Sequence, residues 1–592
     1  MSALPYTAGA AVLHNPDLLP EIFKHLAPFS EPLALAQLEE PPADLLLPEH
    51  TYLCRRTLVA AALTCRAFAE PASSVLWQVL YSGLLPLLCP LSAFRIVADG
   101  NDRTTRYVID SDDVHLEDLA RWTHCTRRVR HLVLSHTEKS LLGAPFVPFF
   151  LLCAMRAGEP ILPLPQTIAF KETSDGYAPS ELLRACLSPT LSSITVMSNI
   201  PHSFSVHLDG DLRMLSTMCD NVQRITIMSH DMVLCNPPLT GFRRLRAVDL
   251  GQIAWEESRP VMSQLRSLEK LEELRVGFWH DNYGVSQPPI KPDPKGFLAL
   301  RKLRLVGTAP ITGQFLSSIG ATSLQHLEVV QTRMNSFADF DTLVSAVPWV
   351  QITPSLRRLY LALHAELHTL RFCDNNPVHA PFFSVLAPLA DLHALETLEV
   401  ATWNRVISIS DDAVAQMGTA WPRLQHLAVT VSSTFTRGPD AALFTPYDAE
   451  IARPTLSGLI QLAERCLSLA YCAIDAASVS EAELVALEEH CDAFSPARVQ
   501  KIQGGLEQLV PARRAHSSHF TLPDVDRLAH ALHSLFPSLE GVSVRPELDI
   551  NFPPTLLPFE RENWGLWSED EQGADVFRLL ERLNEMTKKA AP

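Results

Sequence analysis

The chain has 592 residues, of which 47% are hydrophobic and 19% charged, and its formal net charge at pH 7 is −17. This length exceeds what one compact core holds, so several domains or a repeat architecture are expected, and the apolar content excludes a disordered chain. The acidic balance argues against binding to nucleic acid or to an anionic membrane surface, because both require a basic surface. The 12 cysteines never form a Cys-x-x-Cys pair, so the sequence predicts neither a disulfide framework nor a zinc finger.

No segment is long and apolar enough to span a bilayer, which takes about 20 helical residues. The most apolar stretch, 141–155, is shorter than this and contains Pro145 and Pro148. The residues before Leu18 lack the basic region and apolar core of a signal peptide. These features predict a location in the cytoplasm, the nucleus or both, without a membrane partner.

The N-terminal region, residues 16–81, follows a short extension (residues 1–15) and has helical spacing of its apolar residues. Pro20 suits the first turn of a helix, because its missing amide proton is not needed there. The apolar face predicted for this helix carries Leu19, Ile22, Phe23 and Leu26.

Two further helices are predicted in the same region. One is expected over residues 58–68, and Pro71 is expected to break or kink the helical segment that follows, where a short third helix carries Val75, Leu76 and Val79. The stretch 30–49 is rich in Pro and Glu, which predicts a solvated loop inserted between the first two helices. Residues 16–81 are therefore expected to form a small helical domain.

The region 82–545 carries a recurring signature, Leu-x-x-Leu-x-Leu. Nine copies, 23 to 39 residues apart, begin at Leu191, Val222, Leu245, Leu271, Leu300, Leu324, Leu356, Leu395 and Leu424. The last two apolar positions alternate with polar ones, as a strand with one buried face requires. A strand-sized unit at a nearly regular period predicts a solenoid, because each unit can bury its apolar edge only against its neighbours.

Weaker copies and helical segments complete the pattern. The weaker copies lie at 129–134, 168–170, 469–474 and 539–544, for a total of about eleven to thirteen repeats. Helices are predicted over 411–418 after an N-cap at Ser410 or Asp411, over 480–491, over 523–536 and, within a C-terminal cap of residues 546–592, over 574–589. The expected fold class is α/β: the helical domain, then a curved solenoid with parallel strands on its concave side and helices on its convex side.

Three short motifs in the N-terminal region follow one another in the order of an F-box. They are Leu19-Pro20-Glu21-Ile22-Phe23, Leu63-Thr64-Cys65-Arg66-Ala67-Phe68 and Leu76-Trp77. With the repeats behind it, the chain resembles a fungal-type F-box protein with C-terminal leucine-rich repeats. It departs from that pattern in the inserted loop 30–49.

This resemblance implies a substrate-recognition subunit of a cullin–RING ubiquitin ligase in the ubiquitin-like conjugation pathway. The F-box would bind a Skp-type adaptor, and the repeats would bind a target protein. The residues expected to bind the adaptor are Leu19, Pro20, Ile22, Phe23, Leu26 and Leu63.

The polar strand positions of the repeats predict a protein-recognition strip on the concave side. The residues expected to bind the target are Lys302, Arg304, Glu328, Arg358 and Tyr360. The three basic residues favour a target segment that is acidic or phosphorylated, with Tyr360 as an aromatic anchor. The alternatives are that this face is only solvated and that Glu328 simply pairs with its basic neighbours.

No catalytic motif occurs in the chain, and neither a cofactor nor a metal is expected. His364 and His368 stand four residues apart near Cys373, but no further ligand joins them. We therefore expect an interaction protein rather than an enzyme. The competing interpretation is a leucine-rich-repeat scaffold or GTPase regulator in which residues 16–81 merely cap the repeats.

Overall fold

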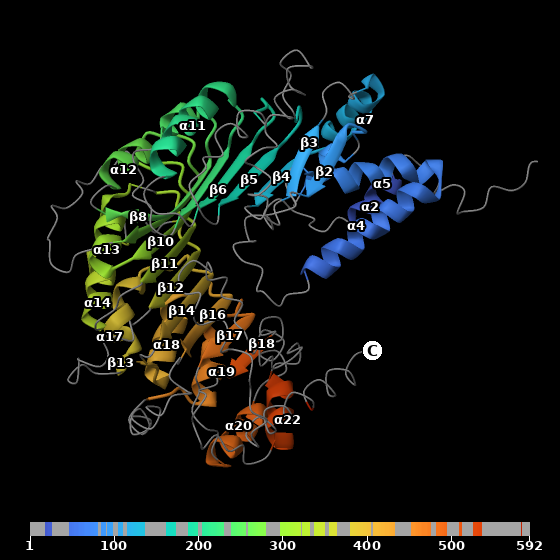
Figure 1. Cartoon of the computed structure of the whole chain (residues 1–592). Helices are drawn as coiled ribbons and strands as arrows, with labels where there is room; N and C mark the ends of the chain where they lie inside the picture. Colours follow the sequence, from blue (N-terminus) through green and yellow to red (C-terminus); the bar gives the residue numbers. More distant parts are fainter. Residues whose placement is uncertain are drawn as a thin grey trace, which may run out of the picture. The chain divides into compact units, whose positions relative to one another are not determined.

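The computed structural model describes most of the predicted helical and repeat segments. The described residues are 18–26, 47–80, 85–89, 91–98, 105–109, 115–135, 162–172, 187–198, 204–229, 238–255, 258–279, 296–320, 322–331, 337–347, 349, 355–363, 379–403, 406–432, 452–474, 481–493, 508–511, 525–535 and 582. They belong to two compact units, one up to Lys270 and one from Leu271 onward. Each unit combines parallel strands with helices, so the fold is mixed α/β with a large, mostly parallel sheet (Figure 1).

The first unit begins with a helical module of α2 (Leu18–Lys24), α4 (Leu47–Thr64) and α5 (Arg66–Gln78). Its core consists of Leu19, Phe23, Leu58, Ala72 and Val75. The ring of Phe68 meets that of Phe23 edge to face, with the centroids 5.5 Å apart. Residues from all three helices thus share one small apolar core.

Two boundaries in this module differ from the prediction. Helix α4 begins at Leu47, inside the predicted loop 30–49, and it ends at Thr64, because Cys65 adopts an extended backbone with φ −157° and ψ 161°. Helix α5 then continues through Pro71, where the sequence predicts a break or a kink, so the break does not occur. Pro71 removes the helical donor to the carbonyl of Ala67, and Ala67 is exposed, so water can replace that donor.

The sheet of the first unit begins directly after α5. Its strands are β1 (Val79–Leu80), β4 (His131–Ser135), β5 (Thr167–Glu172), β6 (Ser193–Ser198), β7 (Arg224–Ser229) and β8 (Ala247–Ala254), each parallel to the next. The remaining elements are α6 (Leu85–Leu88), α7 (Leu116–Thr126), α11 (Phe204–Met218), η3 (Leu239–Gly241), α12 (Ser258–Arg266) and an antiparallel pair, β2 (Phe94–Ala98) with β3 (Thr105–Ile109). Strands β4 and β5 confirm the weaker repeats predicted at 129–134 and 168–170.

The second unit contains a longer run of parallel strands. They are, in order of pairing, β9 (Glu273–Trp279), β10 (Lys302–Gly307), β11 (His326–Gln331), β12 (Arg358–Leu363), β14 (Thr397–Trp403), β16 (His426–Ser432), β17 (Tyr471–Ile474) and β18 (Gln508–Pro511). A separate parallel pair joins β13 (His379–Pro381) to β15 (Val406–Ser408).

Helices lie along one face of these strands. They are α13 (Ala309–Ser318), α14 (Phe337–Ala346), α17 (Phe382–Leu386), η5 (Ala387–Leu389), α18 (Asp411–Ala420) and α19 (Leu456–Arg465), followed by α20 (Glu481–Ala493) and α22 (Val525–Leu535). Neighbouring helices pack against one another, and Figure 1 shows α13, α14 and α17 side by side along the strands. The Ser410 hydroxyl caps α18 by accepting a bond from the Ala413 amide at 3.2 Å, as predicted.

The leucines of the signature explain this order. The first apolar strand position pairs in register from β10 to β16, through Leu303, Leu327, Leu359, Leu398 and Leu427. All five are buried, as are the leucines that open each signature, such as Leu300 and Leu324. Burial of such side chains stabilises a fold by about 1.5–3 kcal/mol each, which makes these ladders the main stabilising feature of the unit.

A backbone pattern repeats with the same period. Two successive amides, at and just before the first residue of ten strands (β5 to β8, β10 to β12, β14, β16 and β17), donate to a single carbonyl of the preceding repeat. The accepting carbonyls belong to Arg130, Gln166, Ser192 and Gln223 in the first unit and to Glu272, Arg301, Gln325, Arg357, Glu396 and Gln425 in the second. The identical geometry in both units shows that the loose copies upstream of Leu245 are structurally equivalent to the clear ones.

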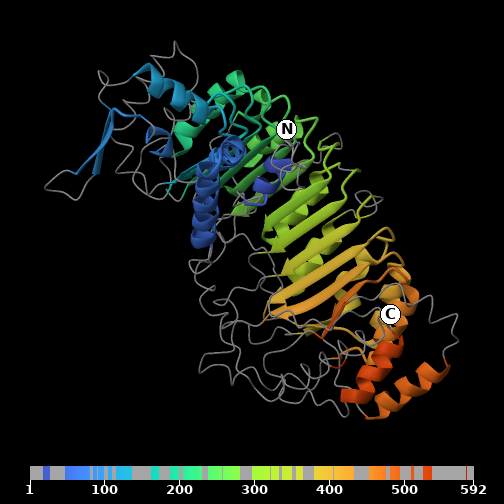
Figure 2. The same ribbon diagram turned by 90° about the vertical axis from the view of Figure 1, so that its right-hand side faces the viewer.

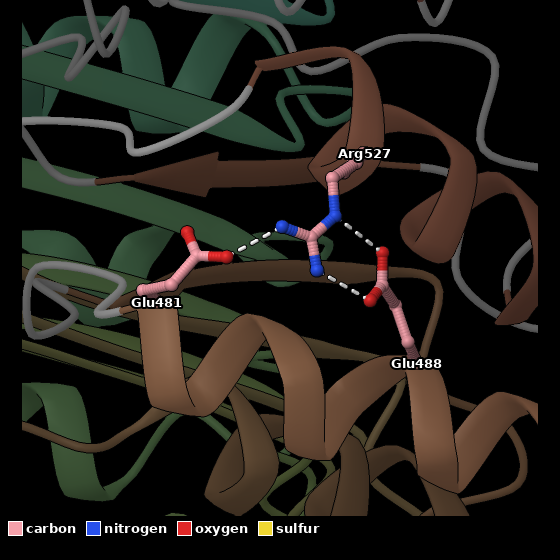
Figure 3. A network of polar contacts seen from close by, with 3 residues as sticks. All are labelled: Glu481, Glu488 and Arg527. Carbon is pink, nitrogen blue, oxygen red and sulfur yellow. Dashed lines mark hydrogen bonds and ion pairs between the residues drawn. The ribbon is translucent and has the colours of Figure 1, made fainter.

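Ion pairs connect α20 and α22, the last two described helices of the second unit. Arg527 of α22 donates to both carboxylate oxygens of Glu488 in α20, at 2.8 and 2.6 Å, and to Glu481 at 2.5 Å (Figure 3). This fork-shaped contact orients α22 on α20. The predictions for residues 1–15, 539–544 and 546–592 fall outside the described residues, apart from Arg582, whose Nε lies 2.7 Å from Asp526 Oδ1.

Candidate functional site

The helical module divides the predicted adaptor-binding residues into two groups. Leu19 and Phe23 are only 5% and 6% exposed and belong to the core of the module, and Leu26 packs against that core. Ile22 and Leu63 are 47% and 82% exposed, and Pro20 is half-buried. Leu19 and Phe23 therefore hold the module together, whereas Ile22 and Leu63 present apolar surface.

Sequence reasoning missed three other exposed apolar residues of this module: Leu18, Leu53 and Val59. Leu18 and Ile22 are four residues apart on α2, and Val59 and Leu63 are four residues apart on α4, so each pair shares a helical face. On α4, Val59 and Leu63 lie about 100° and 140° around the helix from the buried Leu58. The signal was present in the sequence, because these apolar residues lie outside the buried face of a short amphipathic helix.

The module is fixed to the start of the sheet in its own unit. The amide of Arg130, beside β4, donates to the carbonyl of Gln78 at the end of α5, at 2.9 Å. Glu70 of α5 pairs with Arg128 and lies 3.7 Å from His124 of α7. The hydrogen bond from Arg128 lowers the pKa of Glu70, so this carboxylate stays charged and the link persists at neutral pH.

The second surface is the sheet face of the second unit that carries the polar strand positions (Figure 2). Strand pairing arranges these side chains in two rows that cross the strands. The outer row consists of the first residue of each strand, and the inner row consists of the residue two positions farther along. The outer row runs Glu273, Lys302, His326, Arg358, Thr397, His426 and Tyr471, and the inner row runs Arg275, Arg304, Glu328, Tyr360, Glu399 and Ala428. The predicted target-binding residues fall into both rows.

The inner row is largely neutralised. Arg304 Nε lies 3.2 Å from Glu328 Oε1, and both side chains are mostly buried. Burial raises the pKa of Glu328 against the opposing effect of Arg304 and Arg275. Burial also raises the pKa of Tyr360, and Glu328 and Glu399 raise it further. Tyr360 is half-buried, and within the described part of the chain its buried hydroxyl has no hydrogen-bond partner.

The outer row carries the accessible charge. Lys302 Nζ lies 2.7 Å from Glu273 Oε1, with the lysine side chain mostly exposed. Arg358 is exposed, and among the described residues it has no ion pair. Farther along, His426 Nε2 lies 3.2 Å from Glu399 and its ring stacks on Tyr471 with centroids 4.1 Å apart.

The three predicted basic residues are divided between the two rows. Lys302 and Arg358 remain in one row, with His326 between them on β11, whereas Arg304 turns toward Glu328. Burial lowers the pKa of His326, and Arg358 and Lys302 lower it further. His326 was not among the predicted target-binding residues, although the aligned signatures place it at the same position of its repeat as Lys302.

The described ranges contain no group of three or more His, Cys, Asp or Glu residues placed to hold a metal ion. The pair His364 and His368, with Cys373, lies outside the described residues. No described helix is both long and apolar enough to pass through a membrane.

No protein-family model matches the chain, and a search of curated proteins found no significant match. Functional interpretation therefore depends on the two surfaces of the chain itself: the apolar surface of the helical module and the charged rows of the sheet.

Proposed function

We propose that this chain is the substrate-recognition subunit of a cullin–RING ubiquitin ligase. The helical module would bind a Skp-type adaptor, and the strand repeats would form a curved leucine-rich-repeat solenoid that binds a target protein. In this role the chain recognises proteins and has no catalytic activity of its own.

The observation that carries the proposal is an apolar surface on a module with a core of its own. Ile22 and Leu63 remain exposed although Leu19, Phe23 and Leu58 are buried beside them. Large apolar side chains that stay exposed on a module whose core is already formed are consistent with a protein-binding site. They also lie in two of the three motifs that resemble an F-box.

A second observation supports the placement of this module. Helix α5 leads directly into β1, and Glu70 pairs with Arg128 beside α7. An adaptor bound to the module would consequently be held in a fixed position relative to the first strands. Such coupling suits a receptor that must present one protein to another, because loose attachment would spread the target over many positions.

Adaptor capture by the full-length chain tests the proposal. The double variant Ile22→Asp plus Leu63→Asp is expected to lose capture of a purified Skp-type adaptor in a pull-down, since it places charge in the contact while sparing the core. Leu116→Asp is the matched control, because Leu116 of α7 is 85% exposed and lies outside the module.

Undiminished capture by the double variant would refute the proposed contact. Absence of capture by the wild-type chain would refute the ligase role and favour the scaffold interpretation. Circular dichroism of both variants should match that of the wild type, because the substituted residues are exposed.

A further inference from the structure

Strands β2 and β3 form a small antiparallel sheet that is separate from the large sheet. They pair at five positions, from Phe94 opposite Ile109 to Ala98 opposite Thr105. Among the residues that the structure describes, no third strand pairs with either of them. An isolated two-stranded sheet is only marginally stable in water, and a further strand or a packed face is needed to stabilise it. The outer edges of this hairpin are therefore candidate sites for the addition of a strand.

The base of the hairpin is held firmly by its own unit. The Phe94 amide donates to the Leu91 carbonyl at 3.1 Å, and Leu91 is buried. The Ser92 amide donates to a carboxylate oxygen of Asp118 in α7 at 3.3 Å, and the Ser92 hydroxyl donates to the same oxygen. The first amide of β2 is thus already used, whereas β3 makes no backbone hydrogen bond outside the hairpin to another described residue. Strand β3 therefore offers the more available edge.

The composition of β3 suits pairing along that edge. Its sequence is Thr105-Arg106-Tyr107-Val108-Ile109, in which four of the five residues are β-branched or aromatic and none is proline. Such residues favour strands, and proline is a common means of blocking an edge. In an antiparallel pair, alternate residues direct their backbone N–H and C=O groups away from the partner strand. Strand β3 consequently has donors and acceptors to offer to another strand.

We infer that β3 pairs antiparallel with β3 of a second copy of this chain, so that two hairpins form one four-stranded sheet across a twofold axis. The interface is isologous, because the same strand contributes to it from both copies. This inference is independent of the proposed function, since it involves neither the apolar surface of the helical module nor the charged rows of the large sheet.

The sequence of β3 is complementary to itself in one register. Because outward-directed residues alternate, the hydrogen bonds allow only registers that are centred on a residue. When the two strands cross at Tyr107, all five residues are paired and Arg106 lies opposite Val108 of the second copy. A pair centred on Arg106 keeps three of the five and places two arginines opposite each other, which is destabilising. A pair centred on Val108 also keeps only three, so full overlap selects the register centred on Tyr107.

Sedimentation velocity of the full-length chain, loaded at about 1–100 µM, tests the inference. Two paired strands of five residues bury less area than a standard interface, so we expect the 65.6 kDa monomer to form a dimer reversibly, with a Kd in the micromolar range. A chain that stays monomeric throughout would overturn the inference. That result is also expected if the edge pairs with a different protein instead of a second copy.

Cysteine cross-linking reports the register. In the proposed pair, Tyr107 lies opposite Tyr107 of the second copy, where the Cα atoms are about 4.5–5.5 Å apart and a disulfide can form. Tyr107→Cys treated with diamide should give more covalent dimer than the wild type, which measures the background from the native cysteines. Ile109→Cys is the matched control, because the two copies of this position are at least about 13 Å apart along the pair. Equal cross-linking of the two variants, or only background cross-linking of Tyr107→Cys, would overturn the pairing.

Two glutamate variants test which strand forms the interface. Val108→Glu places a carboxylate opposite Arg106 of the second copy, twice by symmetry, and should tighten the dimer by about two- to thirtyfold. Val97→Glu in β2 is the matched control, because it faces an arginine only within its own hairpin, and it should change the Kd by less than about twofold. Both variants spare the hairpin itself, since Val108 pairs with Arg95 there and Val97 pairs with Arg106. Equal Kd values for the two variants would overturn the assignment of the interface to β3.

Discussion

The leucine ladder of the second unit makes a quantitative prediction at its centre. Leu327 is fully buried on β11, between Leu303 on β10 and Leu359 on β12. Replacement by alanine removes the side-chain carbons that touch both neighbours, and strand pairing prevents the two flanking strands from closing the gap. Substitutions of this kind cost about 2–5 kcal/mol, and the rigid surroundings place Leu327→Ala near the middle of that range, at about 3 kcal/mol.

The assay is urea denaturation followed by far-ultraviolet circular dichroism, with the midpoint compared at constant slope. Leu298→Ala is the matched control, because Leu298 is 59% exposed in the turn before the same group of strands. It should cost less than about 0.5 kcal/mol. A loss from Leu298→Ala as large as that from Leu327→Ala would refute the inward orientation of the ladder.

Three further predictions concern local contacts. Glu488→Gln should lower the urea midpoint by the equivalent of about 1 kcal/mol, because it removes the negative charge and one of the two oxygens that accept bonds from Arg527. Glu489→Gln on the exposed side of the same helix should have no effect, and equal midpoints for the two variants would contradict this role. Gly458→Ala should destabilise the chain, because a Cβ there would lie 2.9 Å from Asp411 Cγ and still closer to its Oδ1. A Cβ at Gly210 in α11 would meet nothing within 4 Å, so Gly210→Ala should be neutral or stabilising by up to about 1 kcal/mol. The reverse order of the two variants in thermal denaturation would contradict the packing. The pKa of Glu70 is lowered in the folded chain, so its contribution to stability is present above its unfolded pKa and is lost as pH falls through the folded pKa. Glu70→Gln should remove that part of the dependence of stability on acidic pH. The same dependence of stability on pH in Glu70→Gln and the wild type would contradict the link to Arg128.

The strands were predictable because their signal is periodic and strong. Every clear copy of the signature within the described residues became a parallel strand, and even the loose copy at 129–134 became β4. The strand β18 was missed because its sequence, Leu506-Glu-Gln-Leu509-Val-Pro511, ends on proline where the signature has leucine. A proline there is tolerated because it stands at the last position of the last described strand.

The helix boundaries near the N-terminus were less predictable, because tertiary packing decided them. Residues 58–68 have continuous helical spacing, yet the backbone turns at Cys65, and the amides of Phe68 and Ala69 donate to its carbonyl. The turn lets Ala72 and Val75 of α5 pack on Leu58 of α4. Local propensity carries no information about that long-range contact.

In the candidate site, repeated apolar positions alternate with polar positions that differ from strand to strand. The ladder from Leu303 to Leu427 fixes the register of β10 to β16, and this register in turn determines which polar side chains become neighbours. A shift of one residue in β11 would turn its leucines outward, so burial of Leu327 commits His326 to a position between Lys302 and Arg358. The apolar positions are thus constrained by folding, whereas the polar positions beside them can vary without affecting the core. Substitutions such as His326→Gln can therefore change the chemistry of this face while the fold that aligns it stays the same.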